Sequence, residues 1–358
     1  MELKILQVID TLGVGGAEKV LVTLANLQYK YKDQVAVLTL LEPGELAPAL
    51  NPAIPKWSLH RKWKYNPLTM YRFVQIAKKF DVIHVHSRHN MRYVYLASLV
   101  FALKNRVVFH EHFGDIETDT SVKWHQRLIY PKLYYVGVSE KLCAWAKSKV
   151  GVPDEQVFLL SNTVASYPLV LNQKKEKPEA LKIVIVGNIR RPKNIVFAIK
   201  LLKQIENYNS PTLTIIGKIK DEHYFKELLA LVENLGLVGK VIFEHECNNV
   251  QLILPNFDVA IHPAHSESGP LVLIEYLGQG IPFLAHDVGE VTKIVKNKYP
   301  EYVIDTLELN AWKEKLSEVL DSTSEERKKE LRQFYEENFS EQTYYQKCRS
   351  IYAKVLHS

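Results

Sequence analysis

The chain has 358 residues, a length that favours two domains over one. Hydrophobic residues make up 47% and charged residues 24%, and only 15 glycines and 16 prolines occur, which excludes collagen-like, low-complexity and disordered chains. The net charge of +6 is uneven: residues 1–170 carry 21 Lys/Arg and 14 Asp/Glu, whereas residues 171–358 carry 25 and 26.

Cysteine spacing and hydropathy indicate a reducing compartment. Cys143, Cys247 and Cys348 stand far apart, which argues against a disulfide framework and against a structural zinc site. The first ten residues become polar too early for a secretory signal. The apolar run Val94–Leu103 is about half the length of the roughly 20 residues that a membrane span needs. We therefore expect a cytoplasmic protein.

Short β-branched runs recur along the chain, each followed by a longer helical pattern. Several are continuously apolar, which is typical of parallel strands covered on both faces. In the first half the predicted strands are Leu3–Ile9, Gln34–Leu41, Asp81–His86, Arg106–His110, Tyr135–Val138 and Val157–Leu160. In the second half they are Lys182–Val186, Leu213–Ile216, Val241–Glu244, Val259–His262 and Pro282–Ala285.

This alternation predicts an α/β protein with two Rossmann-like, doubly wound domains that face each other across a cleft. The polar stretch Asn172–Pro178 separates the two series, so we place the domains at 1–171 and 181–340 with a linker at 172–180. Residues 341–358 form a last helix with apolar positions at helical spacing. Ligands of such sheets bind at the loops that follow the strands, and these loops are therefore the candidate site.

A glycine-rich loop, Gly13–Lys19, follows the first strand and opens a helix. Its glycines, Gly15 and Gly16 among them, allow backbone amides to approach an anion at the helix N-terminus. A dinucleotide fingerprint with Glu42 as the ribose-binding acid is weakened because Glu18 occupies the third glycine position. A tight turn without a ligand is the remaining alternative.

Two His-x-His pairs end predicted strands: His84 with His86, and His110 with His112. Side chains two apart on a strand share a face, so a metal centre is conceivable. Few carboxylates lie close by in the sequence, and we expect no metal. His84 and His112 are interpreted as buried structural residues, and His86 and His110 as residues that line the cleft.

The loop Val186–Asn194 places Arg190, Arg191 and Lys193 directly after a strand. Arginine can hold a phosphate bidentately and lysine can act as a point charge, so the three cations could neutralise a diphosphate. A solvated charge cluster is the alternative.

The segment from His262 to Glu275 carries the most specific pattern. A strand ends at His262, a loop with Glu267 follows, and Pro270 suits the start of a helix. Glu275 lies on an otherwise apolar helix, where a carboxylate is costly to bury unless it is hydrogen-bonded. Ribose or sugar hydroxyls are fitting partners, because a carboxylate accepts hydrogen bonds. The helix start, formed by Ser268, Gly269, Pro270 and Leu271, also offers backbone amides to a phosphate from its residues other than Pro270.

Together these residues resemble the retaining GT-B glycosyltransferases of family 4, also described as glycosyl transferases group 1. The resemblance spans essentially the whole chain and is carried by short motifs in a fixed order. They are Gly15–Glu18, Asp81–His86, His110, Val138–Glu140, Ser161–Val164, the Glu267 and Glu275 pair, and Gly280–Pro282.

The resemblance implies transfer of a sugar from a nucleotide-sugar donor, UDP-linked by expectation, with retention of anomeric configuration. The acceptor would be a saccharide or a polyprenyl-linked molecule bound by the first domain, onto which the terminal helix would pack. Glu275 would hold the donor ribose, Glu267 the sugar hydroxyls and Lys193 the diphosphate. Gly16 would approach a substrate, and His110 would contact the donor sugar. The leaving phosphate would deprotonate the acceptor, so no cofactor is expected.

The chain departs from the family pattern at Asn188, Asn194 and Ser268, which replace an arginine and two glycines. Two alternatives therefore stay open. The first is a nucleotide-sugar 2-epimerase of the same fold, and the second is a sugar-nucleotide-binding protein without activity.

Residues 56–79 explain much of the basic charge of the first half. No acidic residue occurs from Leu46 to Phe80, and the cations alternate with Trp57, Trp63, Tyr65, Tyr71 and Phe73. Basic residues mixed with Trp and Tyr are typical of contact with anionic lipid. We expect peripheral association with the inner membrane face, with a solvated loop and core aromatics as the alternative. No nucleic-acid-binding motif accompanies the segment.

Overall fold

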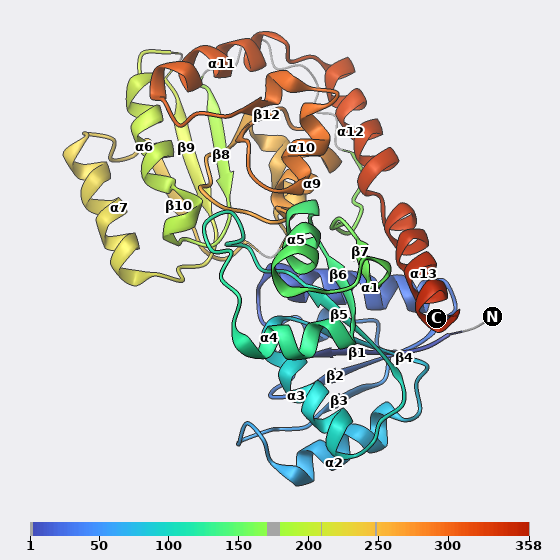
Figure 1. The fold of residues 1–358 in the computed structure, drawn as a ribbon. Helices are drawn as coiled ribbons and strands as arrows, with labels where there is room; N and C mark the ends of the chain where they lie inside the picture. Colours follow the sequence, from blue (N-terminus) through green and yellow to red (C-terminus); the bar gives the residue numbers. More distant parts are fainter. Residues whose placement is uncertain (1–2, 170–179, 209, 248, 358) are drawn as a thin grey trace. The chain divides into compact units, whose positions relative to one another are not determined.

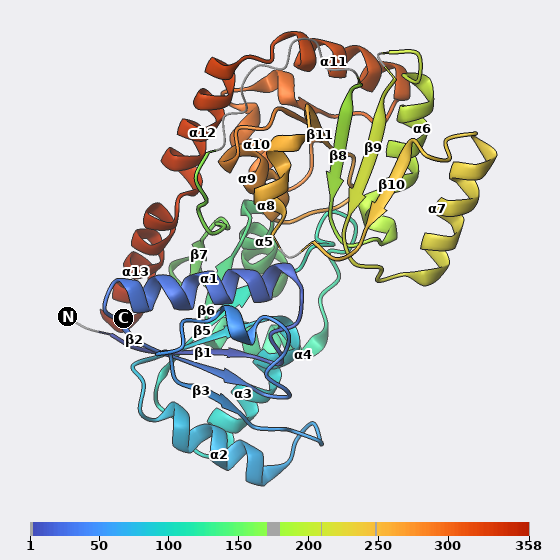
Figure 2. The same cartoon turned by 180° about the vertical axis from the view of Figure 1, so that it is seen from behind.

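The computed structural model describes residues 3–169, 180–208, 210–247 and 249–357. The chain forms two compact units, one of residues 1–165 with 340–358 and one of residues 166–339 (Figures 1 and 2). Most of the expected linker, residues 172–179, lies outside the described residues. The C-terminal segment belongs to the same unit as the N-terminal half.

The first unit is built on a parallel sheet with strand order β3-β2-β1-β4-β5-β6-β7. Consecutive strands pair in register, for example Gln7 with His84 and His86 with His110. The strands are β1 (Lys4–Ile9), β2 (Gln34–Thr39), β3 (Lys56–Ser58), β4 (Val82–His86), β5 (Arg106–Glu111), β6 (Tyr134–Gly137) and β7 (Val157–Leu159).

Helices cover both faces of this sheet (Figure 1). One face packs against α1 (Gly16–Lys30), which in turn contacts α13 (Glu341–His357). The opposite face packs against α2 (Pro67–Ala77), α3 (Arg88–Val100), α4 (Trp124–Ile129) and α5 (Glu140–Trp145). Because strand side chains alternate, Ile83 and Val85 enter this second core. His84 and His86 therefore face the α1 side.

The second unit contains another parallel sheet, with strand order β10-β9-β8-β11-β12-β13. Its strands are β8 (Lys182–Val186), β9 (Thr212–Ile216), β10 (Val241–Glu244), β11 (Val259–His262), β12 (Phe283–His286) and β13 (Val303–Ile304). Its α-helices are α6 (Ile195–Gln204), α7 (Glu222–Asn234), α8 (Val250–Ile253), α9 (Leu271–Gly278), α10 (Glu290–Lys296), α11 (Leu309–Asp321) and α12 (Glu325–Phe339). α11 packs on α6, and α12 packs on α9.

The strands expected from the sequence are confirmed, and their ends differ from the expected ends by two residues at most. β3 and β13 were not expected. They have three and two residues, and at that length no periodic pattern is visible. Within the described part of the chain, no helix combines the length and the apolar character that crossing a bilayer requires.

Candidate functional site

In the second unit, β8 and β11 are neighbours in the sheet, so the loops that follow them emerge side by side. The β8 loop carries Arg190, Arg191 and Lys193, and the β11 loop carries Glu267. The backbone amide of His265 donates to the carbonyl of Pro192 at 2.9 Å, which ties the two loops together. Two predicted site residues that are 74 positions apart are thereby brought into contact.

That contact is an ion pair between the Lys193 ammonium and the Glu267 carboxylate. The side chains are only 13% and 10% exposed, so the pair is largely shielded from water. His262 lies at its inner side, with Nε2 3.6 Å from Oε1 of Glu267. His262 and the ion pair thus form one buried polar group.

The electrostatics of this pair keep Glu267 ionised. Burial by itself raises the pKa of Glu267, but the charge of Lys193 and the His262 ring outweigh it and lower the pKa to about 2. Burial lowers the pKa of His262, which keeps its imidazole neutral at neutral pH. Glu267 is thus an acceptor of hydrogen bonds rather than a proton donor.

The β11 loop is fixed from a second side by the last residue of β12 and by residues that follow this strand. Nδ1 of His286 is hydrogen-bonded to the carbonyl of Ala264 at 2.8 Å, and the amide of Glu290 donates to the carbonyl of Ser268 at 2.8 Å. Gly289 has a φ of +85°, and a Cβ there would lie 3.0 Å from Pro270. Only glycine combines this backbone angle with this close approach.

The departures from the family pattern fit their surroundings. Asn194 caps α6 with φ 52° and ψ 44°, the left-handed conformation, which asparagine tolerates better than other non-glycine residues. Ser268 is buried at 6% exposure, and Asn188 is half-buried. Asn194 therefore preserves the turn that places Lys193.

Glu275 lies in the second turn of α9 and is 7% exposed. Pro270 precedes the helix as its N-cap, one position earlier than expected, and Leu271 is the first helical residue. Gly269 is half-buried in the loop before it. Glu275 is thus a buried carboxylate on an apolar helix, as the sequence predicted.

The arginines after β8 are placed differently from Lys193. The Arg191 guanidinium is 57% exposed and contacts Glu227 of α7 at 2.6 Å, with Asp221 at 3.8 Å. The hydrogen bond to Glu227 raises the pKa of Arg191. Arg190 is half-buried and caps the short 3-10 turn Arg191–Lys193. Of the three cations, Lys193 contacts an acid of the predicted site.

In the first unit, the glycine-rich loop leads into α1 as predicted. Gly15 is the N-cap in an extended conformation, and Gly16 is the first helical residue. Glu18 lies in the first turn, and a Cβ on Gly15 would collide with its carboxylate. Glu42, the alternative ribose-binding acid, is 71% exposed and contacts His60 at 3.1 Å.

The two His-x-His pairs form one cluster on the α1 side of the first sheet. His84, His86 and His110 are 0% exposed, and His112 is half-buried. The expectation that His86 and His110 line a cleft is therefore wrong, because both rings are enclosed by neighbouring side chains. Burial lowers the pKa of His84 and of His112 to about 3 and lowers those of His86 and His110 as well.

Sequence reasoning missed the residues that enclose this cluster. The Tyr352 hydroxyl is 2.6 Å from Nδ1 of His84, and Oε1 of Gln7 is 2.8 Å from Nε2 of His86. Gln28 of α1 donates to Tyr352 at 3.1 Å. Buried glutamines on an apolar strand and helix are the signal that could have indicated a polar cluster.

Glu111, which the sequence placed near the histidines, faces the other side of the sheet. Its carboxylate is 2.5 Å from Nε of Arg88 and is 1% exposed. Burial raises its pKa although Arg88 opposes the shift. Glu111 thus forms an ion pair with Arg88 on the side of the second core.

The basic and aromatic segment 56–79 divides between core and surface. Phe73 is fully buried, whereas Trp63 is 76% exposed. α3 and α4 add apolar side chains to the surface that the sequence did not single out. They are Leu99, Val100, Trp124 and Leu128, each more than half exposed.

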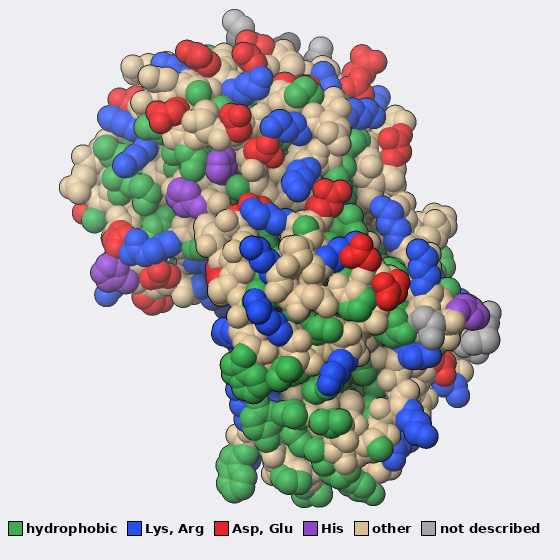
Figure 3. All heavy atoms as spheres, in the orientation of Figure 1, with side chains coloured by type: hydrophobic (Ala, Val, Ile, Leu, Met, Phe, Trp, Pro, Cys, Tyr) green, Lys and Arg blue, Asp and Glu red, His purple; other side chains and the backbone are tan. Residues whose placement is uncertain are grey.

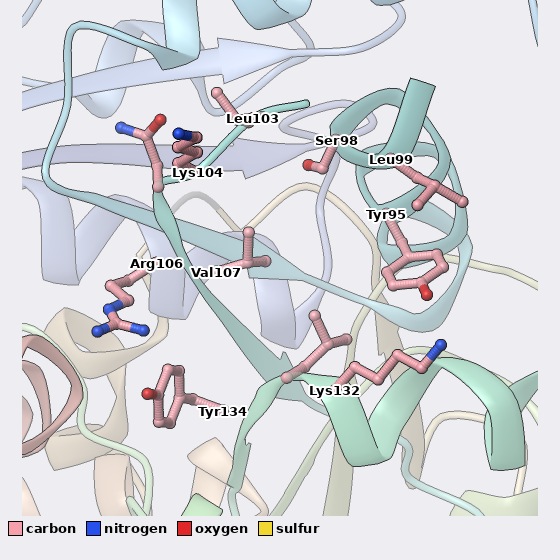
Figure 4. A pocket seen from close by; sticks show the side chains of 11 residues that line it. Tyr95, Ser98, Leu99, Leu103, Lys104, Arg106, Val107, Lys132 and Tyr134 are labelled. Carbon is pink, nitrogen blue, oxygen red and sulfur yellow. The ribbon is translucent and has the colours of Figure 1, made fainter. Parts of the chain in front are cut away.

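A cavity of about 290 Å³ lies in the first unit between α3 and the beginnings of β5 and β6 (Figure 4). Lys104, Arg106 and Lys132 line it, but their charged ends point in different directions. Arg106 is the first residue of β5 and His110 is near its end, so the cavity lies at the opposite ends of the strands from His110. None of the predicted site residues lines it.

Comparison with known proteins matches both halves of the chain. The family description Glycosyltransferase Family 4 matches residues 14–165, and Glycosyl transferases group 1 matches residues 170–338. N-acetyl-alpha-D-glucosaminyl L-malate synthase of Bacillus anthracis is 22% identical over 268 residues, which cover 70% of this chain and 69% of that protein.

Solved structures share the fold over almost the whole chain. Anabaena Alr3699/HepE in complex with UDP and glucose has a TM-score of 0.81 at 16% identity, covering 98% of this chain and 100% of the other. The lipopolysaccharide outer core galactosyltransferase WaaB has a TM-score of 0.73 at 16% identity, covering 98% and 99%. At these identities the likeness shows the fold.

Proposed function

Since the chain belongs to the family-4, group 1 glycosyltransferases of the GT-B fold, we propose that it transfers a sugar from a UDP-linked donor to a saccharide or polyprenyl-linked acceptor with retention of configuration. The observation that carries the proposal is the buried Lys193–Glu267 pair beside α9, with Glu275 on that helix. The complexes of HepE with UDP and glucose support the donor class.

The proposed roles follow from charge and burial. A buried lysine and a buried carboxylate that neutralise each other can exchange partners when a donor enters. The ammonium then faces the diphosphate, and the carboxylate accepts hydrogen bonds from sugar hydroxyls. After this exchange the lysine charge is paired with the diphosphate, and the carboxylate is hydrogen-bonded by the sugar hydroxyls.

Glu275 has the same chemistry toward a ribose. Its carboxylate is buried on α9, and vicinal hydroxyls can donate two hydrogen bonds to it. Ser268, Gly269 and Leu271, which lie directly before and at the start of the helix, would offer backbone amides to a phosphate.

The proposed reaction needs positioning and charge stabilisation more than a side-chain base. Glu267 is ionised at neutral pH and is paired with a cation, so it is a poor general acid. The leaving phosphate of the donor would take the proton of the acceptor hydroxyl, while Lys193 stabilises the negative charge that develops on it. Polysaccharide or glycoconjugate synthesis is the proposed setting.

The test is an assay of UDP release from a panel of UDP-sugars, with and without saccharide acceptors, followed by mass spectrometry of the products. Acceptor-dependent UDP release with a mass gain of one sugar supports the proposal. Appearance of a 2-epimer without transfer would instead assign an isomerase, and donor binding without turnover would assign a binding protein. Either result overturns the transferase proposal.

We further propose peripheral association of the first unit with an anionic membrane surface through segment 56–79. Trp63 is highly exposed between Lys62 and Lys64, and Trp124 on α4 is 75% exposed. Figure 3 shows hydrophobic side chains gathered over the lower part of the first unit, with Lys and Arg side chains around them. Apolar and basic groups together suit an anionic interface, at about 1 kcal/mol per basic residue.

Flotation with vesicles containing phosphatidylglycerol tests this association. The wild type should float with the vesicles at low salt, should not float with neutral vesicles, and should be released by salt. A Trp63→Ser/Trp124→Ser variant should bind weakly, whereas Leu252→Ser, an exposed apolar site on α8, should bind as the wild type does. Equal binding of the wild type and both variants, or no binding by the wild type, would contradict the proposal.

A further inference from the structure

Three histidines from two neighbouring strands converge in the first unit. His84 and His86 come from β4 and His110 comes from β5, and the register pairs His86 with His110 directly. One ring nitrogen of each lies within 4.8 Å of the others. Parallel strand pairing and the alternation of side chains together produce this arrangement on the α1 side of the sheet.

The cluster leaves buried nitrogens without partners. Nε2 of His84 and both ring nitrogens of His110 have no hydrogen-bond partner among the described residues, although both rings are 0% exposed. Burial of a polar atom without a partner costs free energy. Something that accepts lone pairs from imidazole nitrogens would remove this cost.

A second layer of hydrogen bonds holds two of the rings from outside. Tyr352 contacts Nδ1 of His84, and Gln7 contacts Nε2 of His86. Gln7 donates to Gln28 at 3.0 Å, and Gln28 donates to Tyr352, so the outer partners form one chain. Proteins orient a histidine ligand of a metal in this way: the ring nitrogen that faces away from the ion is held by a hydrogen bond, and the other nitrogen binds the ion.

We propose that His84, His86 and His110 bind one transition-metal ion of borderline softness, with Zn²⁺ as the reference ion. Neutral imidazole is a preferred ligand of such ions, and three histidines form a recurrent ligand set. Tetrahedral Zn–N bonds of about 2.1 Å place ligand nitrogens roughly 3.4 Å apart, so the three rings draw together when the ion binds.

His112 lies beside the rings of His86 and His110 and is the candidate for a fourth ligand. Its Nε2 is 3.1 Å from Nδ1 of His86, and the centroids of the His110 and His112 rings are 4.1 Å apart. In the metal-free chain this contact is a hydrogen bond between the two rings. In the metal-bound chain both nitrogens can face the ion, which gives a fourth ligand.

The ion would be structural rather than part of the donor site. It would link β4 to β5 and, through Tyr352, connect both strands to α13. The proposed donor residues Lys193, Glu267 and Glu275 all belong to the second unit. The metal proposal is therefore independent of the proposed function and can fail or hold without it.

The test uses the untagged full chain, stripped with a chelator and dialysed against Zn²⁺. Elemental analysis should then find about one equivalent of zinc, and the melting temperature should rise by roughly 5 °C or more at a hundredfold excess over the dissociation constant. Substituted Co²⁺ should give the intense visible absorption of a tetrahedral nitrogen site and lose it when Zn²⁺ is added.

Variants separate the site from adventitious binding. His84→Ala and His110→Ala should lose the zinc equivalent and the cobalt absorption, whereas His223→Ala, an exposed histidine of α7, should keep both. If the alanine variants fail to fold, the cobalt spectrum of the wild type decides. A wild type without bound zinc after dialysis, or with a purely octahedral cobalt spectrum, would overturn the proposal.

Discussion

At the scale of single residues, the proposed donor site depends on a lysine and a glutamate that are buried together. Lys193 and Glu267 are each about nine-tenths buried, and each compensates the charge of the other. Such a pair adds little net stability compared with apolar residues, but removing one partner leaves an uncompensated buried charge. In the proposed donor complex, charged groups of the ligand bind the lysine, and hydroxyl groups bind the glutamate.

Because removing one partner costs more than removing both, the effects of substituting Lys193 and Glu267 on stability should not be additive. Lys193→Met should lower the free energy of unfolding of the second unit by about 3 kcal/mol, because it leaves the Glu267 carboxylate unpaired. The double variant Lys193→Met/Glu267→Gln should recover much of that loss. Urea denaturation measures both, and additive effects of the two substitutions would contradict the proposed pairing.

The Lys193–Glu267 pair also predicts how the stability of the folded chain changes with pH. The pKa of Glu267 is lowered from 4.5 to about 2 in the folded chain. As the pH falls, Glu267 therefore takes up a proton in the unfolded chain before it does so in the folded chain. The stabilisation that the ionised Glu267 gives to the folded chain is fully present above pH 4.5 and is lost between pH 4.5 and 2. From pH 6 to pH 3 the wild type should lose about 1–3 kcal/mol more stability than Glu267→Gln. Parallel pH profiles of the two proteins would refute this.

At the scale of secondary structure elements, α13 is the clearest case of a long-range contact. Its Tyr345 hydroxyl donates to Asp33 at 2.8 Å, and Arg349 contacts the same carboxylate at 2.5 Å. Tyr31 stacks on Tyr345 with ring centroids 4.3 Å apart. Together with Tyr352 at the histidine cluster, these contacts make the last helix part of the first unit.

Arg349 should therefore matter to the stability of the first unit. The Asp33 side chain is 3% exposed, so Arg349→Met should destabilise the unit by about 2 kcal/mol. Lys347→Met on the exposed face of the same helix should change stability by less than about 0.5 kcal/mol. Thermal unfolding followed by circular dichroism compares the two, and equal melting temperatures would contradict the assigned role of Arg349.

The elements differ in how far the sequence predicts them. Buried parallel strands such as Lys182–Val186 are visible as apolar runs, and the interior strands were located to within two residues. β3 was missed because Lys56 and Trp57 are exposed and only three residues pair. Its place in the sheet depends on backbone pairing with β2, which no local pattern reveals.

The site was predictable where it depends on strand ends and not where it depends on distant side chains. Lys193 and Glu267 follow neighbouring strands, so their loops could be assigned to one edge in advance. The contact of Arg191 with Glu227 depends on the position of α7, and the contact of Tyr352 with His84 spans 268 positions. The sequence therefore indicates two pairs of histidines, but it does not reveal that the pairs are buried together in one cluster.

At the scale of the whole molecule, the chain combines two units that each carry a distinct set of polar groups. The first unit holds the buried histidine cluster and the exposed apolar and basic surface, and the second unit holds the acids and the lysine proposed for the donor. This separation predicts that substitutions in the second unit alone should abolish donor binding, with metal content unchanged.

In the proposed function, the buried acids of the second unit hold a nucleoside diphosphate sugar. Isothermal titration of the full chain with UDP, compared with GDP and ADP, tests it most directly, using Glu275→Gln and the exposed control Glu314→Gln. We expect the wild type and Glu314→Gln to bind UDP alike, and Glu275→Gln to bind it at least about tenfold more weakly, a loss near 1.4 kcal/mol. Unchanged affinity in Glu275→Gln, or no nucleotide binding by the wild type, would contradict it.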